Sequence, residues 1–288
     1  MNIIVYTYSV FHNNGIGGNI AGVVKSDENL TDNQMLKISK KMNISEVVFI
    51  SKNKQKRYKL RYFTPTMEIE YCGHATLAAY FHLFNEKYIS KGTYLAETMS
   101  GDIEIKVEND GRIVSYQQKP IFGETITIDS IQDIFSIPLE SYDISKFEPK
   151  IISTGVKDIF VPICSRADIM NIKPNYELMT EYNKKSNTVG FHLFTFDTFE
   201  KNSTAFCRNF APLYGIDEES ATGSSSGALG CYLAQNSSIS KSSYIFEQGD
   251  YMKMSSRISV DVSIYNNEIN SVSVGGYILY NKRYNLIL

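Results

Sequence analysis

The chain has 288 residues, a formal net charge of −2 and an isoelectric point near 6.1. Hydrophobic residues make up 43% and charged residues 21%, close to the averages of soluble globular proteins, which excludes a disordered or collagen-like chain. The chain has no excess of basic residues to neutralise phosphates, so nucleic acid is not expected as its main partner.

We expect neither a membrane span nor a secretory signal. No window approaches the roughly 18 apolar residues of a spanning helix, and the first six residues lack a basic segment and look like a strand. The four cysteines are widely spaced without a Cys-x-x-Cys pair, which argues against a disulfide framework or a zinc site. The expected location is therefore the reducing cytoplasm.

The first half of the chain combines short strand signals with two helix signals. A helix is predicted over residues 31–42, capped by Thr31 or Asp32, because its apolar residues share one face. A second helix, over residues 74–84, is apolar on nearly all sides, which is typical of a helix buried in a core. Alternating or β-branched runs predict strands at residues 3–8, 21–24, 46–50, 59–63, 102–107 and 112–116.

The second half repeats this style. Another apolar helix is predicted over residues 224–234, together with a weaker amphipathic helix over residues 175–184. Strands are predicted at residues 159–163, 190–196, 244–246, 258–262 and 271–274. Two buried helices among many strands predict an α+β fold with two mostly antiparallel sheets, each curled around its own central helix.

Four blocks of the sequence recur in the same order, which indicates an internal duplication. The offset is 147 residues in the first block and 150 in the others: residues 61–65 match 208–212, Glu68 matches Glu218, Gly73 matches Gly223, and residues 94–97 match 244–247. Chance similarity between strand-turn-helix units is the alternative. The ordered blocks favour two pseudo-symmetric domains built from one duplicated α+β unit.

The duplication predicts where the domains divide. We assign residues 1–118, joined by the final segment 278–288, to the N-terminal domain and residues 119–277 to the C-terminal domain. The crossover is expected within residues 116–149, which show little periodic pattern and contain proline punctuation. An active site is expected in the cleft between the two domains.

Each predicted buried helix begins just after a glycine, Gly73 or Gly223. A helix N-terminus offers free N–H groups and a partial positive charge, so two such ends facing a cleft can hold an anionic or enolising small molecule. The second start lies in the Gly- and Ser-rich stretch 222–227, which lacks the lysine of a P-loop and the Gly-x-Ser-x-Gly elbow of hydrolases. An anion nest for a carboxylate is therefore favoured over nucleotide binding or a serine nucleophile.

Five short motifs carry a family resemblance: residues 43–46 (Asn-Ile-Ser-Glu), 63–65 (Phe-Thr-Pro), 72–77 (Cys-Gly-His-Ala-Thr-Leu), 210–212 (Phe-Ala-Pro) and 218–224 (Glu-Glu-Ser-Ala-Thr-Gly-Ser). In order and spacing they resemble the PhzF-like isomerases of phenazine biosynthesis over essentially the whole chain. The resemblance implies the diaminopimelate epimerase-like fold, with an active site between two similar domains. It also implies a small-molecule carboxylate substrate, no cofactor and, because relatives are often dimers, a homodimer.

The resemblance assigns catalytic roles to four residues. Glu46 matches the family's catalytic carboxylate, which moves a proton between carbons of the substrate, and His74 and Ser224 match the residues that open the two buried helices. Glu219 stands where the family usually has aspartate, and Ser220 replaces the proline that follows. Either change can shift the carboxylate by about an ångström, which is enough to affect catalysis.

Other matched positions are expected to bind the substrate: Asn19, Cys72, Gly73, Thr222 and Gly223. The family's Gly-Asn-Pro pattern around the first of these is altered here to Gly-Asn-Ile. Cys72 occupies the position of one catalytic cysteine in the related two-thiol racemases, but the partner position holds Thr222, whose hydroxyl is too weak an acid for that chemistry. No metal site is expected.

The residues also suggest protonation states. Glu46 precedes an apolar run, so burial is expected to raise its pKa toward neutrality; a solvent-facing glutamate is the alternative. The helix start is expected to favour neutral His74, which could donate a hydrogen bond to a substrate oxygen; a structural core histidine is the alternative. Cys72 is either a thiolate whose pKa the helix start lowers or a buried bystander.

The leading hypothesis is a cofactor-independent isomerase in which Glu46 transfers a proton on a small cyclic or carboxylate substrate. A second hypothesis, motivated by Glu219 and Ser220, is a non-catalytic protein that binds small carboxylates on the same fold. An amino-acid racemase or epimerase is the third.

Overall fold

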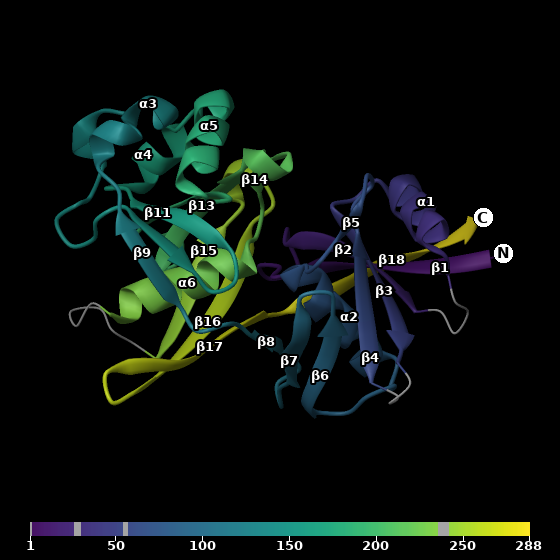
Figure 1. The fold of residues 1–288 in the computed structure, drawn as a ribbon. Coiled ribbons are helices and arrows are strands. Elements are labelled where there is room, and N and C mark those ends of the chain that lie inside the picture. The colour runs from purple at the N-terminus through teal and green to yellow at the C-terminus, as the bar shows by residue number, and fades with distance from the viewer. Residues whose placement is uncertain (1, 26–29, 54–56, 236–241) are drawn as a thin grey trace. The chain divides into compact units, whose positions relative to one another are not determined.

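The computed structural model describes residues 2–25, 30–53, 57–235 and 242–288, and the chain forms two compact units (Figure 1). Unit 1 comprises residues 1–116 and 275–288, and unit 2 comprises residues 117–274. Both units combine strands with one buried helix, so the predicted α+β fold is confirmed. No helix in the described parts of the chain is long and apolar enough to span a membrane.

Unit 1 builds its sheet around helix α2. Its elements are β1 (Asn2–Val10), β2 (Asn19–Lys25), α1 (Asp32–Met42), β3 (Glu46–Lys52), β4 (Tyr58–Phe63), β5 (Glu68–Ile69), α2 (Gly73–Asn85), β6 (Gly92–Thr98), β7 (Gly101–Val107), β8 (Ile113–Tyr116) and β18 (Ile278–Ile287). Strand β1 lies between β2 and β18, antiparallel to both, and places the last strand of the chain beside the first. The apolar helix α2 packs against β1, β2, β3, β7 and β8, as its composition predicts.

Helix α1 begins and ends where its capping signals lie. The hydroxyl of Thr31 accepts a hydrogen bond from the backbone N–H of Gln34 at 3.3 Å, and the Gln34 side chain accepts one from the backbone N–H of Thr31 at 2.8 Å. This reciprocal capping box satisfies two N–H groups that a helix start otherwise leaves unpaired. Asn43, in the left-handed conformation, ends the helix.

Unit 2 repeats the plan around helix α6. Its elements are β9 (Ile121–Thr125), α3 (Gln132–Phe135), β10 (Lys150–Ser153), β11 (Lys157–Pro162), α4 (Arg166–Asn171), α5 (Tyr176–Ser186), β12 (Gly190–Thr195), β13 (Ala205–Ala211), β14 (Ile216–Glu219), α6 (Gly223–Ala234), β15 (Ser243–Gln248), β16 (Ser256–Tyr265) and β17 (Glu268–Gly276), with short 3₁₀ turns at Ile128–Ser130, Leu139–Ser141, Pro212–Tyr214 and Asp250–Met252. A Cβ at Gly230 of α6 would stand 2.6 Å from the Val260 side chain, so this glycine lets the helix approach β16 closely.

The two units share one topology. In unit 1, β2 and β3 are parallel neighbours joined through α1, and β4 and β6 are parallel neighbours joined through α2. In unit 2, β11 and β12 are parallel neighbours joined through α4 and α5, and β13 and β15 are parallel neighbours joined through α6. The matched strands therefore carry the recurring sequence blocks, which supports the duplication.

A matched ion pair gives the duplication a chemical signature. Arg61 on β4 donates from Nε and Nη2 to the Glu68 carboxylate at 2.7 and 2.6 Å. Arg208 on β13 makes the same two-pronged contact with Glu218, at 2.8 Å for both bonds. Arg208 is 1% exposed, and its guanidinium lies 3.8 Å from the ring centre of Tyr251.

Two parts of unit 2 lie outside the sequence prediction. Residues 116–149 hold β9 and α3, although they show little periodicity, because β9 is mostly exposed and α3 is a single short turn. Helix α4 has six residues, too few for a recognisable helical period. Helix α5, the weaker helix prediction, forms over Tyr176–Ser186 with Asn175 as its N-cap.

Candidate active site

The parallel pairing of β2 and β3 brings two predicted site residues to one edge of the sheet. Asn19 is the first residue of β2 and Glu46 the first of β3, with Ala21 directly opposite Glu46. The Ser45 hydroxyl donates to the backbone carbonyl of Ile20 at 3.0 Å and so fixes the register where β3 begins. Because α1 returns the chain to the same edge, both strands start there.

The start of α2 supplies the other residues of this cluster. Cys72 is the N-cap, Gly73 the first helical residue and His74 the second. The Cys72 side chain makes no capping hydrogen bond. Since α2 packs against β2 and β3, its first turn reaches the edge where Asn19 and Glu46 lie.

His74 is the centre of the cluster. Its Nε2 lies 3.2 Å from Oε2 of Glu46, and its Nδ1 lies 3.4 Å from Nδ2 of Asn19 and 3.4 Å from Sγ of Cys72. All four residues are at most 8% exposed. Within the described residues, Glu46 Oε2 and His74 Nε2 complete no hydrogen bond of good geometry, although they are at ion-pair distance. The structure thus brings together four predicted residues, two of which, Glu46 and His74, face each other at ion-pair distance.

The pKa shifts expected for Glu46 and His74 are both wrong in direction. Burial alone raises the pKa of Glu46, but the charge and hydrogen bonding of His74, with a contribution from Ser45, lower the pKa below its ordinary value. Burial lowers the pKa of His74, but the neighbouring Cys72 sulfur and the Glu46 carboxylate together raise it well above its ordinary value. The pKa of each group is thus shifted in the direction opposite to the sequence expectation.

The reactive-thiolate interpretation of Cys72 is also wrong. Burial raises the pKa of this thiol, and the negative charge of Glu46 raises it further; His74 and the backbone of the first turn only partly offset these effects. The thiol is therefore protonated at neutral pH. The helix start, which favoured a thiolate in the sequence prediction, is weaker than desolvation here.

The predicted residues of unit 2 form a separate network at the start of α6. Thr222, the N-cap, donates its hydroxyl to the Glu219 carboxylate at 2.6 Å. Gln248 is fully buried and contacts both residues: its Oε1 accepts from the Thr222 backbone N–H at 3.1 Å, and its Nε2 donates to the Glu219 carbonyl at 2.8 Å. Sequence reasoning missed Gln248 as a functional candidate, although it directly follows the recurring block at residues 244–247.

Three further side chains hold the first turn of α6. Gln117 Nε2 donates to the Gly223 carbonyl at 3.1 Å, and the Thr154 hydroxyl donates to the Ser224 carbonyl at 3.1 Å. The hydroxyl of the next residue, Ser225, donates to the buried Asp158 carboxylate. Sequence reasoning missed all three, because their contacts join residues 67 to 106 positions apart. Ser224 itself is half-buried.

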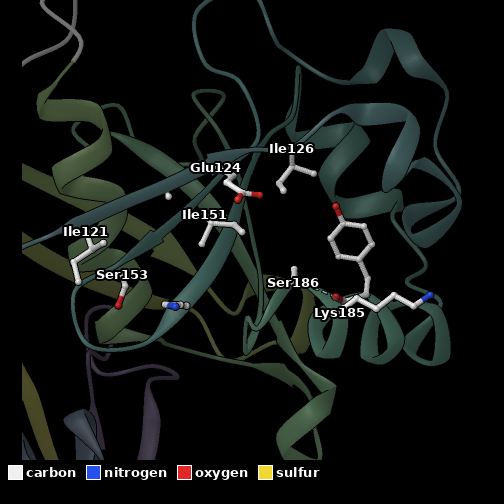
Figure 2. Close-up of a pocket in the computed structure, with 10 residues that line it drawn as sticks. Ile121, Glu124, Ile126, Ile151, Ser153, Lys185 and Ser186 are labelled. Carbon is white, nitrogen blue, oxygen red and sulfur yellow. Dashed lines mark hydrogen bonds between the residues drawn. The ribbon is translucent and has the colours of Figure 1, made fainter.

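Unit 2 also holds a cavity of about 550 Å³ (Figure 2). It lies between β9, β10 and α5, and none of the predicted site residues lines it. Figure 2 shows isoleucines on its strand side and Lys185 pointing outward from α5. Its lining residues are Ile121, Gly123, Glu124, Ile126, Ile151, Ser153, Lys157, Tyr182, Lys185 and Ser186.

Comparisons with known proteins agree with the fold and the sequence motifs. The family model of the phenazine biosynthesis-like proteins matches residues 8–280. An uncharacterized isomerase of Clostridium acetobutylicum is 30% identical over 94% of each chain. The crystal structure of a PhzF-family phenazine biosynthesis protein from Bacillus anthracis superposes with a TM-score of 0.90 at 25% identity and covers both chains completely.

A more distant structure shows the same fold. A hydroxyproline epimerase of Agrobacterium vitis superposes with a TM-score of 0.63 at 10% identity, covering 99% of this chain and 92% of the epimerase. The fold is thus the diaminopimelate epimerase-like fold that the sequence predicts. Family model, relatives and structures agree over nearly the full length, and the chain therefore belongs to the phenazine biosynthesis-like family of PhzF-type isomerases.

Proposed function

We propose that this chain is a cofactor-independent isomerase in which Glu46 moves a proton between two carbons of a small carboxylate substrate. The observation that supports this most directly is the buried contact between Glu46 and His74, 3.2 Å apart, whose facing atoms lack well-formed hydrogen bonds in the described chain. Burying such atoms is costly unless a ligand completes their bonding. A substrate at these atoms would supply the missing partners.

The protonation states give the direction of the chemistry. The lowered pKa of Glu46 makes it a carboxylate in the resting enzyme, so it acts first as the base. It takes a proton from a carbon beside an unsaturated or carboxylate-activated centre, and the electron pair left behind delocalises into that system. The protonated Glu46 then returns the proton to another carbon of the same molecule. No other reactant is consumed.

His74 has the matching role of donor. Because Nδ1 accepts from the Asn19 amide or the Cys72 thiol, Nε2 carries the proton and can donate it in a hydrogen bond to a substrate oxygen on which negative charge develops. The Asn19 amide and Cys72, both 3.4 Å from His74 Nδ1, hold the ring in place, and we assign them and the Gly73 amide to substrate contacts. A low-pKa carboxylate is a weak base, so the substrate carbon must already be acidic.

In unit 2 we assign substrate binding to Glu219, Thr222, Gly223 and Ser224. The bond from Thr222 to Glu219 and the buried Gln248 fix the first two in position. Thr222 is also the N-cap equivalent to Cys72, and it carries no thiol. A two-thiol racemase mechanism is therefore disfavoured, and a single carboxylate carries the proton.

The proposal is tested by following deuterium from solvent into substrate. Wild-type protein is incubated in D₂O with a panel of cyclic and aromatic carboxylic acids, and NMR identifies any carbon that gains label. We expect label at a defined carbon of at least one acid, and loss of this exchange in Glu46→Gln with the fold and acid binding retained. Glu104→Gln, which alters an exposed glutamate of β7 in the same unit, is the matched control.

Two results would contradict the proposal. Exchange that persists in Glu46→Gln removes Glu46 as the base. Saturable binding of an acid by the wild type, with no exchange and no turnover of that acid, points instead to a non-catalytic carboxylate-binding protein.

A further inference from the structure

Three buried side chains around His74 together form a set of metal ligands. Glu46, Cys72 and His74 each offer one ligand atom, and the three atoms lie within 4.8 Å of one another. They provide an oxygen, a sulfur and a nitrogen. Glu46 comes from β3 and the other two from the start of α2, so the set joins two elements of unit 1.

The chemistry of this set favours zinc over the common alkaline-earth ions. Thiolate and imidazole are ligands of Zn²⁺ and similar transition metals, whereas Mg²⁺ and Ca²⁺ take oxygen ligands. Zinc–ligand bonds of about 2.0–2.3 Å separate neighbouring ligands of a tetrahedral ion by about 3.4–3.6 Å. The 3.4 Å between Cys72 Sγ and His74 Nδ1 matches this separation.

Two further observations support an ion at this place. Glu46 Oε2 is buried without a well-formed hydrogen bond in the described chain, so a carboxylate ligand atom is available close to the sulfur and the ring nitrogen. Metal binding releases the proton of the Cys72 thiol, and the resulting thiolate and the Glu46 carboxylate together balance the charge of a divalent ion, which a buried position requires. Three protein ligands leave the fourth tetrahedral position open to water or to a substrate carboxylate.

We propose that Glu46, Cys72 and His74 form a binding site for Zn²⁺ or a similar transition-metal ion, and that the bound ion inhibits the isomerase. Inhibition follows because the ion binds the Glu46 carboxylate, which then cannot act as the base. This second half rests on the function proposed above. Binding itself does not, so the two parts are tested separately.

Binding is tested with Co²⁺ as a spectroscopic substitute on protein freed of metal by a chelator. A cysteine thiolate bound to Co²⁺ gives a charge-transfer absorption in the near ultraviolet, which we expect to saturate at equimolar metal and to disappear when Zn²⁺ is added. Cys72→Ala should abolish the band. Cys164→Ala, which removes the exposed cysteine of unit 2, is the matched control and should keep it.

A loss of the band through misfolding must be distinguished from a loss of the metal ligand. Because the Cys72 side chain makes no capping bond, Cys72→Ala is expected to fold, which circular dichroism and thermal unfolding verify. Glu46→Gln keeps the thiol and should keep the band while weakening Zn²⁺ binding at least about tenfold in calorimetry. The site is refuted if the wild type shows no band, or if the band survives in Cys72→Ala.

Inhibition is tested in the deuterium-exchange assay. Added Zn²⁺ should stop exchange by the wild type and by Cys164→Ala alike, and a chelator should restore it. Saturating Zn²⁺ that leaves the rate unchanged, or raises it, overturns the inhibitory role even if the metal binds. Metal-free wild type that exchanges no acid contradicts the proposed function instead, and the cobalt spectrum then still decides whether the metal site exists.

Discussion

Asp158 on β11 accepts a 2.5 Å hydrogen bond from Ser225 on the first turn of α6, although the carboxylate is only 3% exposed. Burial raises the pKa of Asp158 to about 6, and the hydrogen bonds from Ser225 and the Gly190 backbone only partly offset this effect. A residue that no motif singled out thus joins the central strands of unit 2 to the helix start that carries Ser224.

The raised pKa of Asp158 predicts a pH-dependent stability. Its carboxyl binds a proton more tightly in the folded than in the unfolded chain, so its stabilising contribution is complete below the ordinary pKa of 3.8 and is lost as the pH rises through about 6. The shift corresponds to at most about 3 kcal/mol. We expect Asp158→Asn to lack this contribution, so the difference in unfolding free energy from the wild type should change between pH 5 and pH 7 in urea titrations. An unchanged difference would contradict the assignment.

The protonation of His82 at low pH should destabilise unit 1. This histidine is 2% exposed, its Nδ1 lies 2.8 Å from the Tyr8 hydroxyl, and burial lowers its pKa to about 4. The folded chain therefore holds it neutral, and the stability it contributes is complete above pH 6.5 and is lost as the pH falls through about 4. We expect His82→Phe to leave the Tyr8 hydroxyl unpaired and to reduce the unfolding free energy by about 1–3 kcal/mol at pH 7. Denaturant unfolding measures this, and a loss near zero would exclude a structural role for the pair.

The two matched ion pairs should differ in strength. The Arg208 and Glu218 side chains are 1% and 8% exposed, whereas those of Arg61 and Glu68 are 24% and 22% exposed. Removing one partner of a buried pair leaves an uncompensated charge, so we expect Glu218→Gln to cost about 3–5 kcal/mol. Glu68→Gln, the equivalent change in unit 1, should cost about 1 kcal/mol or less. Equal losses in thermal or urea unfolding would show that burial does not set the difference.

The cysteines should separate clearly by reactivity. Burial raises the pKa of all four thiols, but Cys164 is exposed whereas Cys72, Cys207 and Cys231 are buried, so access to the reagent sets the difference. We expect a disulfide reagent to label one thiol rapidly in the native protein and the other three only on unfolding. The fast phase should vanish in Cys164→Ser. Fast labelling of Cys72 would instead restore the reactive thiolate that the structure argues against.

The fold could be predicted from the sequence because its signals are local and occur twice. The capping residues of α1 and the apolar surfaces of α2 and α6 are visible in short windows, and the recurring blocks reveal the topology. Helix α4 and strand β9 could not be predicted, since six residues are too few for a helical period and an exposed strand lacks alternation.

The candidate site could be predicted by residue type but not by charge state. Motif matching brings Asn19, Glu46, Cys72 and His74 into one list, and the structure places them in contact. Their pKa shifts depend on which groups they face in the fold. Burial and a neighbouring opposite charge shift the pKa of a group in opposite directions, so the sequence alone does not give the direction of the shift. Gln248 was missed because its side chain acts on residues more than 25 positions earlier in the chain.

The pairing of β1 with β18 has a consequence for the order in which the protein can fold during synthesis. Unit 2 is one continuous stretch and can fold as soon as it has been made. Unit 1 begins to be made first, but the edge of β1 that β18 covers stays open until nearly the whole chain has left the ribosome. An unpaired strand edge is a template for aggregation. Strand β1, the first strand to be made, is therefore the segment of the nascent chain that is exposed to aggregation for the longest time.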